Sequence, residues 1–119
     1  MSKKYEHLSK KHRTRTMKYD YEEEHPSCYL IQQGDKWGYL DRRRRLIVRP
    51  QYEQAWAFRE GLAAVKKYGK WGYINRYGKT VIGHKFTRAS YFTDGKAKVT
   101  YKGKQIYINR YGKCVQDCQ

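Results

Sequence analysis

The chain has 119 residues, which is enough for one small domain, and no stretch of it approaches the roughly 18 consecutive apolar residues of a membrane-spanning helix. Its formal charge is +16, and the residues from 26 onwards carry 20 Lys or Arg against 6 Asp or Glu. The charge therefore belongs to the body of the chain, and polyanions are the expected class of partner. The start of the chain has no apolar segment of a secretory signal, so we expect a cytoplasmic protein with no membrane contact.

Residues 1 to 26 form the first predicted segment. Residues 1 to 19 hold seven Lys or Arg against one Glu, with too few apolar side chains to offset the entropy of ordering. This composition predicts a flexible basic N-terminal arm, which either binds an anion or is only a solvated tail. The sequence His25-Pro26-Ser27 interrupts the chain, so we place a boundary there and a β domain over residues 27 to 119.

A repeat organises the rest of the chain. Residues 69 to 79 read GKWGYINRYGK, and the same segment returns 34 residues later, at 103 to 113, with Gln105-Ile106 in place of the Trp-Gly pair. Residues 35 to 41, DKWGYLD, are a more diverged third copy. A constant period of this size indicates an array in which each unit buries its apolar face by packing against its neighbours.

Each repeat contains a predicted β-hairpin. The dipeptides Gly34-Asp35, Tyr68-Gly69 and Lys102-Gly103 each lie between β-prone segments, which is typical of tight hairpins with primed turns. A turn at 68 and 69 pairs residue 66 with 71, 65 with 72, 64 with 73 and 63 with 74. Because side chains alternate across a strand, one face is then apolar or glycine in every repeat. This predicted core face consists of Tyr29, Ile31, Gly38 and Leu40, then Ala63, Val65, Gly72 and Ile74, then Ala97, Val99, Ile106 and Ile108.

The opposite face of the hairpins combines aromatic rings with lysines. It holds Trp37 and Tyr39 in the first repeat, Lys66, Trp71 and Tyr73 in the second, and Lys98 and Tyr107 in the third. We expect Lys66 and Lys98 to lie against their cross-strand rings, a contact that contributes about 0.5 to 1 kcal/mol when exposed. Two interpretations stay open. The rings either present contact area to a partner or are covered by connecting segments and adjacent repeats.

A turn of five residues follows each hairpin. Gly78 and Gly112 are expected to adopt the left-handed conformation there. The first repeat instead reads Arg42, Arg43, Arg44 and Arg45, with Arg44 at the glycine position, where that conformation costs about 1 kcal/mol. Such a departure without visible compensation suggests function. The predicted polyanion-binding residues are these four arginines with Lys66, Lys98, Arg76 and Arg110.

The segments that connect the repeats share a spacing of three, with Tyr52, Ala55 and Phe58 in one and Phe86, Ala89 and Phe92 in the other. That interval predicts a single helical or 3₁₀ turn. Pro50 is expected to end the strand before it. Gly38 and Gly72 lie within strands, where a missing Cβ predicts the close approach of another backbone or a bulky ring.

The chain carries little that points to chemistry. Cys28, Cys114 and Cys118 are an odd and sparse set, which predicts free thiols, and no second close pair completes a zinc site. The acids of the repeats are scattered singly at turns, and His84 is the one histidine after residue 27. With no convergent set of titratable groups, we expect neither catalysis nor a cofactor or metal.

Four motifs taken together resemble the WG-repeat family of bacterial proteins. They are KWGYLD at 36 to 41, RPQY at 49 to 52, FREGLAAVK at 58 to 66 and GKWGYIN at 69 to 75, and the resemblance covers about residues 28 to 115. It implies a mainly β fold, a short array of about three stacked hairpin repeats, that acts as an interaction module without common catalytic residues. Three departures stand out, at Gln105-Ile106, at Arg44, and at Gly83-His84 where the first repeat has Arg49-Pro50.

The sequence thus predicts a non-catalytic accessory module that docks on a polyanion. The expected partner is nucleic acid or a nucleoprotein enzyme such as an RNA-guided nuclease, recognised by backbone or shape because no base-reading motif is present. The alternative is an adaptor that uses the aromatic face to bind an acidic protein or a second copy of itself. Salt distinguishes the two, since phosphate binding weakens steeply with salt and a dry aromatic interface does not.

Overall fold

The computed structural model describes residues 28 to 119 of the protein. The predicted N-terminal arm, residues 1 to 26, lies outside the described residues, as does Ser27. Over the described range the chain forms strands β1 to β11 and no helix, so the prediction of a mainly β fold is confirmed. It follows that none of these residues belongs to a helix long and apolar enough to cross a membrane.

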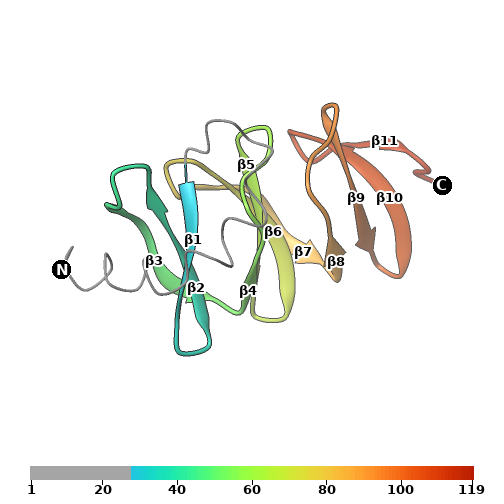
Figure 1. Ribbon diagram of the computed structural model, residues 1–119. Helices are drawn as coiled ribbons and strands as arrows, with labels where there is room; N and C mark the ends of the chain where they lie inside the picture. Colours follow the sequence, from blue (N-terminus) through green and yellow to red (C-terminus); the bar gives the residue numbers. More distant parts are fainter. Residues whose placement is uncertain (1–27) are drawn as a thin grey trace.

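The strands form three antiparallel sheets, one for each repeat, which follow one another in chain order (Figure 1). The first sheet has the order β1-β2-β3, from Cys28–Gln33, Lys36–Asp41 and Leu46–Tyr52. The second has the order β4-β5-β6-β7, from Gln54–Ala55, Leu62–Lys67, Lys70–Asn75 and Thr80–Phe86. The third has the order β11-β10-β9-β8, from Cys114–Gln116, Lys104–Asn109, Lys96–Tyr101 and Arg88–Ala89.

The hairpin register agrees with the sequence prediction in all three repeats. Lys66 pairs with Trp71 across β5 and β6, and the equivalent residues pair across β1 and β2 and across β9 and β10. Tyr68 and Gly69 both have positive φ, as do Lys102 and Gly103, which is the requirement of a type I′ turn. In the first hairpin only Gly34 has positive φ, as in a type II′ turn.

Both faces of the middle hairpin are buried, because the repeats stack. One cluster joins the outer face of the first hairpin to the apolar face of the second, through Leu30, Tyr39, Ala63, Val65 and Ile74. The other joins the second hairpin to the third in the same way, through Ala64, Trp71, Tyr73, Ala97, Val99, Ile106 and Ile108. The apolar face of each following repeat therefore packs on the aromatic face of the repeat before it.

The connecting segments are extended, so the prediction of a helical or 3₁₀ turn is wrong. The amides of Glu53 and Trp56 donate to the carbonyls of Lys66 and Ala64, each at 2.9 Å, and β4 pairs with β5 between them. β8 pairs with β9 in the same way in the next repeat. The edge of the hairpin offers unpaired backbone groups, and pairing with that edge satisfies the backbone of the connecting segment better than one isolated turn.

The strand glycines allow a close crossing of two backbones, as predicted. A Cβ at Gly72 would lie 2.7 Å from the carbonyl oxygen of Ile82, and one at Gly38 would lie 2.7 Å from the nitrogen of Pro50. The register of β2 against β3, and of β6 against β7, shifts at these points. β3 continues through Pro50 to Tyr52, so the prediction that Pro50 ends the strand is wrong. A bulge is one of the few places where a strand tolerates proline.

The cysteine prediction is correct for one residue of three. Cys28 is buried and keeps its thiol, whereas Cys114 and Cys118 form a disulfide with 5.8 Å between their Cα atoms. Asp117 adopts a left-handed conformation, with φ of 61°, directly after β11 ends at Gln116. That bend returns the chain on itself over four residues and brings the second cysteine to the first, which the odd cysteine count did not indicate.

We predict that Gly72→Ala destabilises the fold by about 1 to 3 kcal/mol, because the added Cβ forces the β6 and β7 backbones apart. Gly83→Ala is the matched control, since a Cβ at Gly83 meets nothing within 4 Å. The midpoint of urea unfolding measures both variants. Equal midpoints for the two variants would contradict the close crossing.

Candidate functional site

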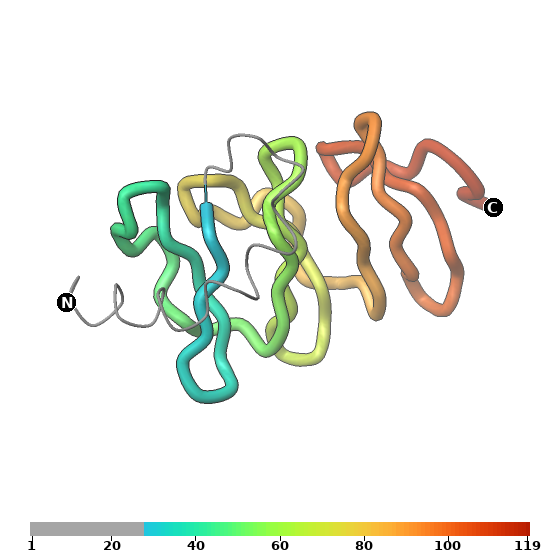
Figure 2. Tube along the Cα trace, viewed as in Figure 1, coloured from blue at the N-terminus to red at the C-terminus, as the bar shows by residue number. Residues whose placement is uncertain are grey.

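The longer turns of the three repeats lie along one edge of the array. Neighbouring antiparallel strands reverse direction, so the turns at 42 to 45, 76 to 79 and 110 to 113 lie at the ends opposite the hairpin turns. Figure 2 shows the first set along the top of the view and the hairpin turns at 34–35, 68–69 and 102–103 along the bottom. We call the first set the arginine edge and the second the hairpin edge.

The three turns of the arginine edge share one conformation. In the second repeat the Oδ1 atom of Asn75 accepts the amides of Tyr77 and Lys79, at 2.9 and 3.0 Å. Asn109 makes the same two bonds in the third repeat, and the Asp41 carboxylate makes them in the first. The left-handed position holds Gly78, Gly112 and, with φ of 66°, Arg44. The predicted conformation is therefore present in all three, including the repeat that lacks the glycine.

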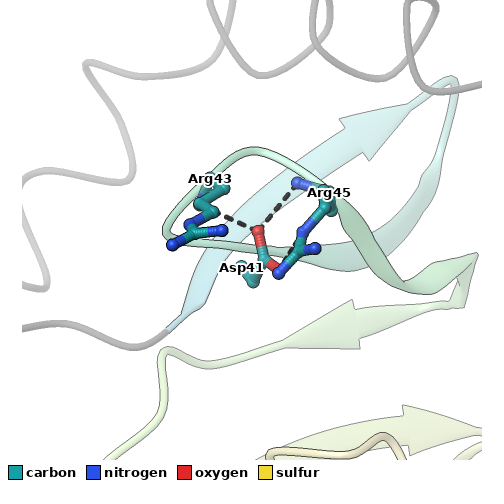
Figure 3. A network of polar contacts seen from close by, with 3 residues as sticks. All are labelled: Asp41, Arg43 and Arg45. Carbon is teal, nitrogen blue, oxygen red and sulfur yellow. Dashed lines mark hydrogen bonds and ion pairs between the residues drawn. The ribbon is translucent and has the colours of Figure 1, made fainter.

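Asp41 compensates part of the arginine run (Figure 3). Its Oδ1 accepts the amides of Arg43 and Arg45, each at 2.8 Å, and its Oδ2 lies 3.0 Å from Nε of Arg45. Burial of the carboxylate raises its pKa, but the two amide bonds and then the Arg45 side chain lower it, and the net pKa is below the ordinary value. Asp41 is therefore charged at neutral pH and offsets one of the four arginines.

The glycine of this turn also packs against the preceding repeat. A Cβ at Gly78 would lie 2.9 Å from Cγ2 of Val48, and one at Gly112 would lie 3.3 Å from Cγ2 of Ile82. Val48 and Ile82 lie in β3 and β7, the last strand of the repeat before in each case. Arg44 takes the same left-handed position in the first repeat, where Asp41 compensates part of the departure, which corrects the expectation of an uncompensated one.

The arginine edge gathers most of the predicted cations. Arg42, Arg43 and Arg45 are exposed and Arg44 is half-buried, while Arg76 and Arg110 are exposed on the neighbouring turns. Arg76 and Tyr77 line one groove together with Asp41 and Ile47, so the first and second turns are adjacent. Arg110 reaches the third position on the edge, where its Nη1 lies 3.4 Å from the carbonyl oxygen of Glu60.

Lys66 and Lys98 are not part of that edge. They lie within β5 and β9, Lys66 half-buried and Lys98 exposed. The ring of Tyr107 is approached by Lys96, whose Nζ lies 5.2 Å from the ring centroid, rather than by Lys98 as predicted. The predicted set of cations therefore divides into an edge of arginines and two separate lysines.

The predicted aromatic contact residues are largely in the core. Tyr39 and Tyr73 are 0 % and 1 % exposed and Trp71 is 7 % exposed, so the interpretation of an aromatic face open to a partner is wrong for these three. Trp37 and Tyr107 are half-buried. The rings are covered because the next repeat packs on them, which was the other interpretation that the sequence left open.

Among residues 28 to 119, three tyrosines have exposed rings, and the sequence prediction did not single them out. Tyr77 and Tyr111 are 84 % and 85 % exposed on the arginine edge, and Tyr68 is 85 % exposed on the hairpin edge. Their signal in the sequence is the glycine that follows each of them. That glycine marks a turn, where a side chain is directed away from the core.

Glu60 contacts Arg110 through its backbone carbonyl and the third repeat through its carboxylate. Its oxygens accept the amides of Asp94 and Gly95, at 2.7 and 2.9 Å, and so join the second and third repeats. This acid therefore has a structural use in joining two repeats. Among residues 28 to 119 no three His, Cys, Asp or Glu side chains are grouped so that they could hold a metal ion.

Comparison with known proteins gives one match. The family model described as "WG containing repeat" matches residues 37–71 and 71–104. Neither the curated proteins nor the solved structures include a match to this chain.

We predict that Arg44→Gly stabilises the fold by about 1 kcal/mol, because glycine adopts the left-handed conformation without the steric cost. Arg43→Gly removes the same charge from a residue without positive φ, and it controls for reduced repulsion among the arginines. Thermal or urea unfolding compares them. Equal stabilisation by both variants would assign the effect to charge instead of backbone strain.

A second prediction concerns Asp41→Asn, which keeps the Oδ1 acceptor that Asn75 and Asn109 provide and removes the charge. Because the folded state lowers the pKa of Asp41, its charge stabilises the fold above the unfolded pKa of about 4, and this contribution is lost as the pH falls through the lower folded value. The stability of the natural protein relative to Asp41→Asn should therefore decrease between pH 6 and pH 3 in urea unfolding. A difference that does not change with pH would contradict the charge-dependent contacts.

Proposed function

The chain belongs to the WG containing repeat family, and from that premise we propose that it is a non-catalytic binding module that docks on a polyanion through the arginine edge. The proposed partner is nucleic acid, or a nucleoprotein enzyme such as an RNA-guided nuclease that holds its own nucleic acid. The observation that carries the proposal is the position of the four-arginine turn directly beside the Arg76 turn on one exposed edge.

The chemistry of arginine supports this assignment. A guanidinium stays charged at all relevant pH values and offers paired N–H donors that match the oxygens of a phosphate. Asp41 is the carboxylate bound to this turn, and it occupies the Nε of Arg45 and two backbone amides. Arg42 and Arg43 remain exposed to the solvent. A polyanion lying along the edge would therefore meet several guanidinium groups at once.

The alternative of an adaptor keeps less of its surface. That hypothesis used the aromatic face to bind an acidic protein or a second copy of the chain. Trp71, Tyr39 and Tyr73 are buried between repeats, and Trp37 and Tyr107 are half-buried, so the arginine edge supports binding better than this face does. An acidic protein that binds the arginine edge instead would be an outcome of the experiment below.

We also propose a cytoplasmic location, where a nucleic-acid partner is accessible. The Cys114–Cys118 disulfide is the observation against it, because disulfides are rare in reducing compartments. Trapping of free thiols at cell lysis, followed by mass spectrometry, decides this point. A pair that is fully oxidised in the cell would place the protein in an oxidising compartment.

The proposal predicts that replacing Arg42, Arg43 and Arg45 by Ser and Arg44 by Gly weakens nucleic-acid binding by at least about tenfold at moderate salt. Each lost phosphate contact should also lower the slope of log K against log salt by about 0.7 to 0.9. The fold should persist, because these side chains lie outside both core clusters. Fluorescence anisotropy with a labelled oligonucleotide, repeated over a range of salt concentrations, measures both quantities.

A matched control variant removes four positive charges from the hairpin edge. It replaces Lys36, Lys70, Lys102 and Lys104 by Ser. These lysines flank or occupy the hairpin turns. An equal loss of affinity in both variants would assign binding to net charge and not to the arginine edge. A natural protein that binds no nucleic acid at low salt would overturn the proposed function.

A further inference from the structure

We propose that the arginine edge binds single-stranded nucleic acid, with Arg43, Tyr77 and Tyr111 as a row of platforms on which unpaired bases stack. This inference rests on the proposed function and names its substrate class. It starts from the two exposed tyrosines of the edge, which no part of the fold described above requires.

The side chains at this turn position do not build the turn. Tyr77 and Tyr111 contribute only their amides, which donate to the Oδ1 atoms of Asn75 and Asn109 at 2.9 Å. In the first repeat Arg43 donates its amide to Asp41 in the same way, with an entirely different side chain. A ring at this position is therefore optional for folding, and two large rings in water need another explanation.

The three side chains share a planar π surface. Tyrosine rings stack with bases, and the guanidinium plane of arginine stacks with them as well. In the sequence each of the three is preceded by an arginine and followed two residues later by Arg45, Lys79 or Lys113. Every turn thus offers one flat surface between two cations, which is the arrangement that binders of single strands use for a base and its flanking phosphates.

The turns hold the backbone of these three residues at fixed positions. Each turn is closed by two bonds to the Asx side chain, and the second and third turns also pack on the preceding repeat through Gly78 and Gly112. The same turn occurs in each repeat, so three such turns follow one another along the edge, as the top of Figure 2 shows. A turn held in this way loses little backbone entropy on binding, so less of the stacking energy is offset.

A duplex would not use these platforms. Its bases are stacked on one another and expose only their edges, so a duplex could contact the cations but not the rings. Inorganic polyphosphate and acidic proteins match the charge and have no bases. A contribution of the tyrosines to affinity therefore distinguishes a single strand from these other polyanions.

The two tyrosines are not equivalent. Tyr77 shares its groove with Asp41 and Ile47, beside the four-arginine turn, whereas the third turn lies near Glu60, whose carbonyl oxygen is 3.4 Å from Arg110. The carboxylate of Glu60 accepts the Asp94 and Gly95 amides nearby. Phosphates should approach the first two turns more closely, so Tyr77 should contribute more than Tyr111.

The test compares the full chain with Tyr77→Ala, Tyr111→Ala and the double variant. The probes are a 12-residue oligothymidylate, a duplex of the same length and inorganic polyphosphate, at one salt concentration. We expect each alanine to weaken oligothymidylate binding by about tenfold, with the larger loss at Tyr77, and to leave polyphosphate and duplex binding unchanged. Tyr77→Trp should keep the affinity because it keeps a stacking surface.

Tyr68→Ala is the matched control, because Tyr68 is exposed to the same degree and lies on the hairpin edge. It should bind oligothymidylate as the natural protein does. A natural protein that binds all three probes alike, with no loss on removal of the tyrosines, would overturn the single-strand inference and leave the polyanion proposal standing. A loss on polyphosphate as large as on oligothymidylate would also overturn the inference. Failure to bind any probe would overturn both.

Discussion

The structure depends on a buried tyrosine that needs a partner for its hydroxyl group. In the first two repeats this ring is covered completely, and the hydroxyls of Tyr39 and Tyr73 donate to the carbonyls of Trp56 and Ser90 at 2.7 and 2.8 Å. Those carbonyls belong to the segment that leads into the next repeat. The same segment then brings a phenylalanine edge-on to the ring, at 4.8 and 4.9 Å between centroids. One hydrogen bond thus fixes the path of the connection, and the path fixes how the next hairpin stacks.

The stacking determines which side chains remain for a partner. The aromatic faces of the first two repeats are covered by the following repeat, so within residues 28 to 119 the fully exposed rings lie on turns. At the third repeat the pattern changes, because Gln105 replaces the tryptophan and is exposed, and Lys98 and Tyr107 share that outer face. Within residues 28 to 119 no further repeat packs on this face, and its polar side chains fit that exposure.

The sequence predicted what depends on local spacing and missed what depends on contacts between repeats. Period and alternation gave the hairpin register and the left-handed position at Arg44, because both follow from backbone geometry within one unit. Period and alternation could not show whether Trp71 and Tyr73 were covered, since that depends on how Ala97 and Val99 of the next repeat pack against them. The spacing of Tyr52 and Phe58 fits a helical turn as well as an extended segment. The segment is extended because it pairs with the edge of β5. The disulfide depended on a left-handed bend at Asp117, for which the sequence had no signal.

The arginine edge carries a cluster of charges that lowers the stability of the fold. Four neighbouring arginines repel one another, one of them in a left-handed conformation that costs about 1 kcal/mol, and Asp41 offsets part of this. The other two turns reach the same conformation with Asn, Tyr and Gly, so the fold itself does not require the arginine run. Exposed ion pairs stabilise proteins little, and Asp41 with Arg45 is such a pair. A costly charge that the fold can do without supports the proposed docking on a polyanion, and the flat side chains between the cations are the reason to propose a single strand.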